Sequence, residues 1–116
     1  MSVNIEKLVE EFAKAIIKQN EAIMKGNYKL GNKYAKKYIK CYQQLFKVGE
    51  EGKEALAKLF NHDDIGVREM AAVVLLKYKT EEALKILREL ANKPGLIGFG
   101  ASEAIKRWEE GTWNLE

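Results

Sequence analysis

The sequence predicts an all-α protein built from six helices. Apolar residues recur at spacings of three and four along most of the 116 residues, which is the periodicity of amphipathic helices. The segments between these stretches, "NHDD", "KYKT" and "NKPG", are rich in turn-forming residues. No stretch of useful length alternates apolar and polar residues as a half-buried strand would. We therefore expect helices joined by short turns, and no β-sheet.

The first two predicted helices are long and form a hairpin. The first covers about residues 4–25, with Asn4 as its N-cap and Gly26 as its C-terminal stop. The second covers about residues 28–48 and stops at Gly49. Because only a tight turn separates them, we expect these two helices to pack antiparallel.

Four shorter helices follow, at about residues 51–61, 65–78, 81–92 and 96–110, and Thr80 is the expected N-cap of the third of these. Two internal matches relate them. "EALAKL" at 54–59 matches "EALKIL" at 82–87, and "VREMAAVVLLKY" aligns with "IGFGASEAIKRW", which pairs Tyr78 with Trp108. Offsets of 28 and 30 residues predict stacked pairs of helices. We expect one domain over residues 1–116, composed of a hairpin (1–49), two repeats (50–78 and 79–111) and a C-terminal tail (112–116).

One of these stretches carries a family resemblance. "DDIGVREMAAVVLL" resembles the second helix of a HEAT-type repeat, in which a turn precedes Val-Arg, small residues and a leucine pair. The second copy departs from this pattern, because Gly98 stands where the first copy has Arg68. With "GNKYAKKYI" and "AIKRWEEGTW", the order of pieces over nearly the whole chain is similar to a family of small standalone bacterial HEAT-like-repeat proteins of uncharacterised function.

The resemblance implies a right-handed HEAT-like α-α superhelix and no enzyme activity. Some small HEAT-like proteins of bacteria are immunity proteins that block a partner toxin. That comparison is an analogy at the level of the fold, and a fold alone does not give a function.

Composition sets a few bounds. The only cysteine is Cys41, so the chain has no disulfide of its own, and we expect a reducing, cytoplasmic location. The opening "MSVNIEKLVEEF" is charged and amphipathic, unlike a secretory signal. The longest uncharged run, "PGLIGFGAS", is far shorter than the ~20 apolar residues of a membrane helix, so we expect no membrane association.

The strongest candidate site is a stripe of lysines on the second helix. Residues 28–48 hold six lysines and no acid, so this helix carries +6. Because the net charge of the chain is +3, the rest of the sequence carries −3. On a helical wheel, five of the lysines lie within an arc of roughly 60°, and Lys37 lies beside them. The candidate partner-binding lysines, called the lysine ridge below, are Lys29, Lys33, Lys36, Lys37 and Lys40.

Three interpretations of the lysine ridge remain open at this stage. It is a solvated helix face, partly neutralised by Glu6, Glu10 or Glu21 of the first helix, or it binds an acidic protein partner. Alternatively, it follows a nucleic-acid backbone with weak, salt-dependent and sequence-nonspecific affinity. The tyrosines of this helix fall mostly on the opposite, apolar side, which weakens the nucleic-acid interpretation. The sequence does not predict an oligomeric state.

Other motifs favour structural roles. In "HDD", Asp63 or Asp64 is expected to cap the following helix, and three consecutive side chains cannot easily converge on one metal ion. Arg68 lies in the first turn of its helix, where we expect an acid of an adjacent repeat or Asp64 to compensate it; a partner contact is the alternative.

The glycine-rich "KPGLIGFGASEA" matches neither phosphate-binding pattern, so we expect Gly98 and Gly100 to permit close helix packing. Trp113 is expected to fold back onto the end of the array, with an exposed partner anchor as the alternative. The sequence shows no catalytic constellation, cofactor motif or metal-ligand cluster. The sequence therefore predicts a non-catalytic protein-interaction module, and a weak, sequence-nonspecific nucleic-acid-binding protein is the alternative. The resemblance to small HEAT-like proteins implies an immunity-type inhibitor as a specific form of the interaction module. Its contact residues would be the lysine ridge, and Arg68 is a further candidate.

Overall fold

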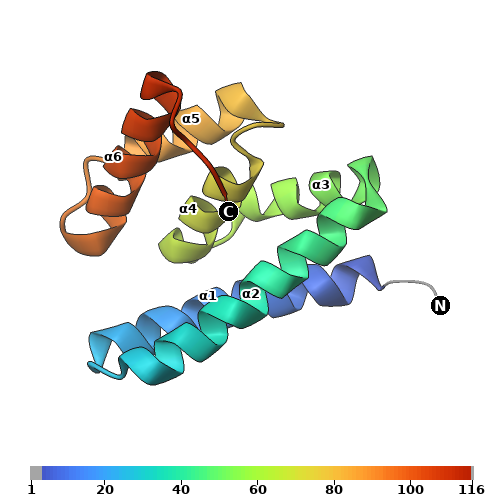
Figure 1. Cartoon of the computed structure of the whole chain (residues 1–116), viewed down its shortest axis with the longest axis horizontal. Helices are drawn as coiled ribbons and strands as arrows, with labels where there is room; N and C mark the ends of the chain where they lie inside the picture. The colour runs from blue at the N-terminus through green and yellow to red at the C-terminus, as the bar shows by residue number, and fades with distance from the viewer. Residues whose placement is uncertain (1–3, 116) are drawn as a thin grey trace. The chain divides into compact units, whose positions relative to one another are not determined.

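The computed structural model describes residues 4–115, and it is all-α over that range, as predicted. Six α-helices are joined by short connections, with one turn of 3-10 helix, η1, after the third (Figure 1). Their bounds are α1 (Ile5–Met24), α2 (Tyr28–Val48), α3 (Glu50–Ala57), η1 (Lys58–Asn61), α4 (Ile65–Leu75), α5 (Thr80–Leu90) and α6 (Gly95–Glu110). Residues 4–115 contain no strand.

The chain divides into two compact units between Leu59 and Phe60. The N-terminal unit (residues 1–59) contains α1, α2 and α3, and the C-terminal unit (residues 60–116) contains α4, α5 and α6. The predicted repeat at 50–78 spans this boundary. Its first helix, α3, packs against α1 and α2, whereas α4 packs against α5 and α6.

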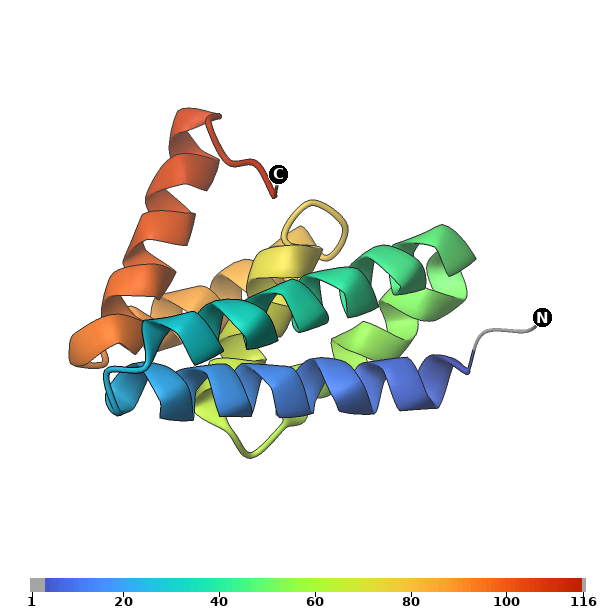
Figure 2. The same ribbon diagram turned by 60° about the horizontal axis from the view of Figure 1, so that its bottom comes forward.

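In the N-terminal unit, α1 and α2 run antiparallel and side by side (Figure 2). The Asn4 side chain accepts a hydrogen bond from the backbone N–H of Lys7 at 3.0 Å, which confirms Asn4 as the N-cap of α1. Gly26 adopts φ = +76° in the turn, a left-handed conformation that glycine enters without strain. The Asn27 side chain then caps α2 by accepting from the N–H of Leu30 at 3.1 Å. The hairpin is therefore held at its turn by sequence-local contacts.

Aromatic side chains fill the space between α1 and α2. The buried ring of Phe12 meets the rings of Tyr38 and Tyr42 edge-on, with centroids 5.9 and 6.5 Å apart. Such edge-to-face pairs are a favourable aromatic geometry. Tyr38 and Tyr42 thus belong to the core, as the helical wheel predicts, whereas Tyr34 is half-buried and Tyr28 is 66% exposed. The fully buried larger side chains of this unit are Phe12, Ile16, Leu45 and Leu56.

In the C-terminal unit, α4 packs against both α5 and α6. Its buried side chains are small or branched, which allows neighbouring helices to approach closely. The buried residues of α4 are Gly66, Val67, Ala71, Ala72, Val74 and Leu75. Opposite them lie Ala83, Leu87 and Leu90 of α5 and Ala101 and Ala104 of α6.

Two local predictions were wrong at the connection between α4 and α5. The α4 helix ends at Leu75 and not at residue 78, so Tyr78 lies in the following turn and is 44% exposed, whereas Trp108, its counterpart in the internal match, lies within α6. Thr80 is the first residue of α5, not its N-cap, and its hydroxyl donates to the carbonyl of Leu76 at 2.8 Å. The Thr80 hydroxyl thus bonds to the end of the preceding helix instead of capping its own.

Candidate functional site

The lysine ridge occupies the exposed side of α2. All five of its lysines are exposed, and Lys47 further along the helix is exposed as well. Tyr38, Tyr42 and Leu45 of the same helix are buried. This division follows directly from the helical period, and it agrees with the predicted separation of lysines from aromatic residues.

No ridge lysine forms an ion pair with any residue between 4 and 115. Two of the acids expected to neutralise the ridge are engaged elsewhere on α1. Glu10 pairs with Lys14 at 3.1 Å, and Glu21 pairs with Lys18 at 4.0 Å. The positive charge of the ridge is therefore uncompensated by direct contacts within the described chain.

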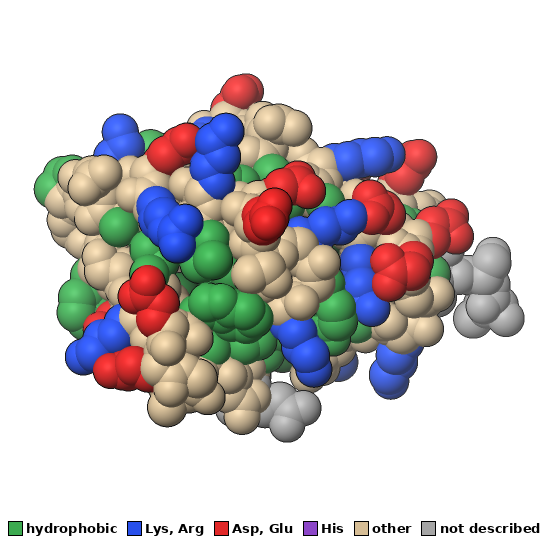
Figure 3. All heavy atoms as spheres, turned by 90° about the horizontal axis from the view of Figure 1, so that it is seen from above, with side chains coloured by type: hydrophobic (Ala, Val, Ile, Leu, Met, Phe, Trp, Pro, Cys, Tyr) green, Lys and Arg blue, Asp and Glu red, His purple; other side chains and the backbone are tan. Residues whose placement is uncertain are grey.

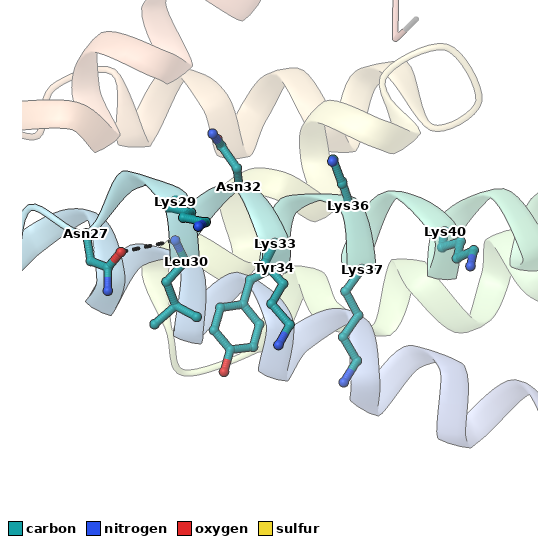
Figure 4. Close-up of a pocket in the computed structure, with 9 residues that line it drawn as sticks. All are labelled: Asn27, Lys29, Leu30, Asn32, Lys33, Tyr34, Lys36, Lys37 and Lys40. Atoms are coloured by element: carbon teal, nitrogen blue, oxygen red, sulfur yellow. Dashed lines mark hydrogen bonds between the residues drawn. The ribbon is translucent and has the colours of Figure 1, made fainter.

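A surface hollow runs along this part of α2, and all five ridge lysines line it together with Asn27, Asn32, Leu30 and Tyr34. Figure 4 shows that Lys33 and Lys37 point to the same side of α2 as Leu30 and Tyr34, whereas Lys36 and Asn32 point to the other side. The hollow therefore combines cationic groups with apolar surface.

Figure 3 shows one face of the molecule. Acidic and basic side chains are interspersed over it, with apolar side chains between them. Such mixing of signs is usual for a soluble protein surface. Residues 22–49, by contrast, contain seven lysines and no acid. The concentration of one sign along α2 is what distinguishes the candidate surface.

Cys41 lies on α2 one helical turn after Lys37, and it is buried. Burial raises the pKa of the Cys41 thiol, and the nearby Glu11 carboxylate adds to this effect, whereas Lys37 opposes it. A thiol of raised pKa holds little nucleophilic thiolate at neutral pH. Cys41 is therefore a packing residue in this arrangement.

Arg68 belongs to α4 of the C-terminal unit, whereas the lysine ridge belongs to α2 of the N-terminal unit. Its guanidinium donates to the backbone carbonyls of His62 and Asp63, at 2.7 and 3.3 Å. The partners of Arg68 are thus backbone carbonyls of the loop before its own helix. The sequence had predicted an acidic side chain as its partner. Through these contacts Arg68 stabilises the loop that precedes α4 within its own unit.

The "HDD" loop also serves the start of α4. The Asp64 carboxylate accepts from the N–H of Val67 at 3.0 Å, and this confirms Asp64 as the N-cap. Nδ1 of His62 accepts from the N–H of Asp64, also at 3.0 Å. Residues 4–115 contain no group of three His, Cys, Asp or Glu side chains that could hold a metal ion.

The glycines of α6 permit close packing at two positions. At Gly98, a Cβ atom would collide with the backbone carbonyl oxygen of Lys93, in the loop before the helix. At Gly100, a Cβ atom would lie 3.3 Å from Oε1 of Glu69, a residue of α4. Gly98 therefore accommodates the entry of the chain into α6, and Gly100 accommodates the Glu69 carboxyl.

Glu69 is a chemically unusual residue that the sequence analysis did not identify. Its Oε2 atom is buried with no hydrogen-bond partner within residues 4–115. Burial raises the pKa of Glu69 to about 7, although a hydrogen bond from the backbone of Ala101 opposes the shift. The sequence held one indication that Glu69 would be buried. Only two of the eleven residues of α4 are charged, so most of this helix is expected to pack against other helices.

Trp113 folds back onto the end of α6. Its indole meets that of Trp108 edge-on at 5.8 Å, and its backbone N–H donates to the carbonyl of Arg107 at 3.0 Å. The left-handed Gly111, at φ = +74°, ends the helix and turns the chain. Trp113 therefore packs against its own unit, in line with the structural alternative that the sequence favoured.

No helix among residues 4–115 is both long enough and apolar enough to cross a lipid bilayer.

Comparison with known proteins identifies the fold. The sequence matches no protein-family model, and a search of the curated proteins found no match. The crystal structure of the protein RPA1889 from Rhodopseudomonas palustris CGA009 is similar, with a TM-score of 0.91 and 21% sequence identity. The similarity covers 99% of this chain and 96% of that one. At this identity the likeness shows a shared all-helical fold, and the HEAT-like family assignment stays a prediction.

Proposed function

We propose that this protein is a non-catalytic interaction module whose lysine ridge binds an acidic surface of a partner protein. The observation that carries the proposal is the set of five exposed lysines on one helix, none of them in an ion pair within residues 4–115. Like charges at i,i+4 destabilise a helix by a few tenths of a kcal/mol. The ridge therefore lowers the stability of α2, and a bound anionic surface would offset this repulsion.

The mechanism would be occlusion of the partner by a preformed surface. The helix that carries the ridge is fixed by its Asn27 cap and by the aromatic core beneath it. A rigid surface loses little conformational entropy on binding, which favours affinity. An immunity-type inhibitor that covers a partner's active site is the specific form of this function that we propose, in a reducing, cytoplasmic setting.

The test compares wild type with two variants of equal net charge. The ridge variant is Lys29→Glu, Lys33→Glu and Lys36→Glu, and the control variant is Lys85→Glu, Lys93→Glu and Lys106→Glu, which changes exposed lysines of the C-terminal unit. Each tagged protein is incubated with lysate of the native host and eluted across a salt series. We expect one protein that wild type and the control variant retain in near-equal amounts and that the ridge variant loses.

Two results would contradict the proposal. Equal retention of the same partners by the ridge variant and the control variant would leave the ridge as a solvated helix face. Retention of nucleic acid by wild type would favour the alternative, a sequence-nonspecific nucleic-acid binder. In that case log affinity would fall with log salt at a slope of about −3.5 for five single-strand phosphate contacts.

A further inference from the structure

The lysine ridge borders an exposed apolar edge on α2, formed by Leu30 and Tyr34. These two residues are one helical turn apart, so they lie on the same face of the helix. Leu30 is 37% exposed and Tyr34 is partly exposed. Both line the hollow that the ridge lysines also line, and both point to the side taken by Lys33 and Lys37 (Figure 4).

The backbone that carries this apolar edge is well fixed. The N–H of Leu30 donates to the Asn27 side chain at 3.1 Å, and the N–H of Asn27 donates to the carbonyl of Ala22 at 2.8 Å. At Gly31, a Cβ atom would lie 3.3 Å from the side chain of Ile23, so α1 and α2 approach closely beside the apolar edge. The edge is therefore presented by a preformed hairpin end.

We infer that this part of α2 binds an acidic protein segment that carries a large apolar side chain. The apolar side chain would lie against Leu30 and Tyr34, while carboxylates of the segment reach Lys29, Lys33 and Lys37. The inference rests on the proposed function and adds the chemistry of the partner. It follows from two complementary features of one surface, the uncompensated positive charge and the apolar edge within the same hollow.

The arrangement favours a protein segment over other anionic partners. A phosphate backbone would use the lysines but would leave the apolar edge in water. An anionic lipid surface calls for one broad apolar face on the helix. The exposed apolar residues of α2 are instead divided between two sides of the lysine ridge, with Leu30 and Tyr34 on one side and Tyr28 and Ile39 on the other. A single side chain of a partner fits an apolar spot that is flanked by charges.

The experiment uses two fluorescent peptides of about 15 residues and equal negative charge. One has glutamates interspersed with leucines, and the other has serine at every leucine position. Binding to the full chain is measured by fluorescence anisotropy at about 0.15 M salt. We expect the leucine peptide to bind about tenfold more tightly, because burying one large apolar side chain supplies that much affinity.

Variants and amide chemical shifts locate the contact. Leu30→Ser removes the preference for the leucine peptide, and Leu30→Met, which stays apolar, retains it. The control is Leu96→Ser, at an apolar residue of the C-terminal unit that is 67% exposed, and it leaves the preference unchanged. On the wild-type protein, the leucine peptide shifts the amide resonances of residues 29–37, so the location does not depend on the folding of any variant.

The outcomes separate this inference from the proposed function. If both peptides bind equally and Lys29→Gln with Lys33→Gln weakens both, the apolar edge is unused and the inference fails while the proposed function stands. If neither peptide binds, the inference fails, and the proposed function fails with it only if the ridge variant and the control variant also retain the same partners equally from the lysate. Tighter binding to phosphatidylserine vesicles, or to single-stranded DNA, than to the leucine peptide would overturn the inference. The partner would then be the membrane surface or the nucleic acid, and not a protein segment.

Discussion

Glu69 shows how one residue can set the pH dependence of stability. In the unfolded chain its carboxyl group titrates near the ordinary value of 4.5, whereas burial raises its pKa to about 7 in the folded state. The folded state therefore binds more protons between these values, and the free energy of unfolding falls as pH rises through this window. Below about 4.5 the penalty is absent, and above about 7 it is complete, at up to about 3 kcal/mol.

We predict that Glu69→Gln stabilises the protein at pH 8 and leaves it nearly unchanged at pH 4. Glutamine is close in shape to the protonated acid and does not ionise, so it avoids the cost of a buried charge. Urea denaturation from pH 4 to pH 9 measures the effect, with Glu109→Gln, at an exposed position of α6, as the control. Parallel curves for Glu69→Gln and wild type would show that Glu69 ionises freely in the folded protein.

Gly98 and Gly100 allow a comparison of two kinds of close contact on one helix. Alanine improves helix propensity by roughly 1 kcal/mol at either position. At Gly98, however, the new Cβ atom meets the backbone carbonyl of Lys93, which can move only with the chain. At Gly100 it meets the end of the Glu69 side chain, which can rotate away.

We therefore predict that Gly98→Ala destabilises the protein by about 2 kcal/mol, while Gly100→Ala stays within about 1 kcal/mol of wild type. Thermal unfolding followed by circular dichroism measures both. A loss of stability for Gly100→Ala equal to that for Gly98→Ala would mean that Glu69 is held as firmly as backbone.

At the scale of elements, the sequence predicted helix starts well where a side chain caps the backbone. Asn4 and Asp64 were both identifiable as N-caps, and both accept the expected hydrogen bond. The predicted limits of α2, residues 28–48, agree with the structure because polar Asn27 and left-handed Gly49 bound it. An N-cap hydrogen bond joins residues three apart in the chain, so it can be predicted from the sequence.

Features that depend on tertiary packing were less predictable. The predicted helix at 51–61 is an α-helix only to Ala57 and continues as the 3-10 turn η1. The burial of Glu69 depends on how closely α6 approaches α4 at Gly100, and a glycine in a sequence does not indicate which side chain will pack against it. In the same way, periodicity placed Leu30 on the apolar side of α2, whereas the hairpin end leaves it partly exposed. The exposed lysines of the ridge, by contrast, followed from the helical period alone.

The repulsion within α2 leads to a prediction about that helix. Lys33 stands one turn from both Lys29 and Lys37, so Lys33→Glu turns two like-charge i,i+4 pairs into two opposite-charge pairs. We expect Lys33→Glu to raise the free energy of unfolding by about 0.5–1 kcal/mol at low salt.

Urea denaturation at low salt and at about 1 M salt tests this expectation, because screening should remove most of the gain. Lys33→Gln is the matched control: it removes the repulsion without adding attraction, so its gain should be about half as large. If Lys33→Glu destabilised the protein instead, the Lys33 side chain would make a favourable contact that outweighs the repulsion.

At the scale of the whole molecule, fold and surface charge carry different information. The chain shares its fold with RPA1889 at 21% identity, so most positions can change while the helices keep their arrangement. A fold preserved in this way does not specify a partner. The charge of this chain is distributed asymmetrically, because α2 carries +6 while the remaining residues carry −3 within a net charge of +3. Properties that depend on the charge distribution should therefore be governed by α2.

Cation-exchange chromatography at pH 7 tests this at constant net charge. One variant carries Lys29→Gln, Lys33→Gln and Lys36→Gln, and the other carries the same change at the exposed Lys85, Lys93 and Lys106; both have a net charge of zero. An adsorbing surface binds the most concentrated patch of charge, and local potential rather than net charge sets the salt needed for elution.

We expect the variant that retains the lysine ridge to elute at a salt concentration close to that of wild type, and the variant without it to elute much earlier. Circular dichroism spectra that match wild type establish that both variants are folded. If the two variants eluted together, net charge would govern adsorption, and the lysines of α2 would not form a coherent electropositive surface. That result would also remove the electrostatic basis on which the proposed binding of an acidic partner depends.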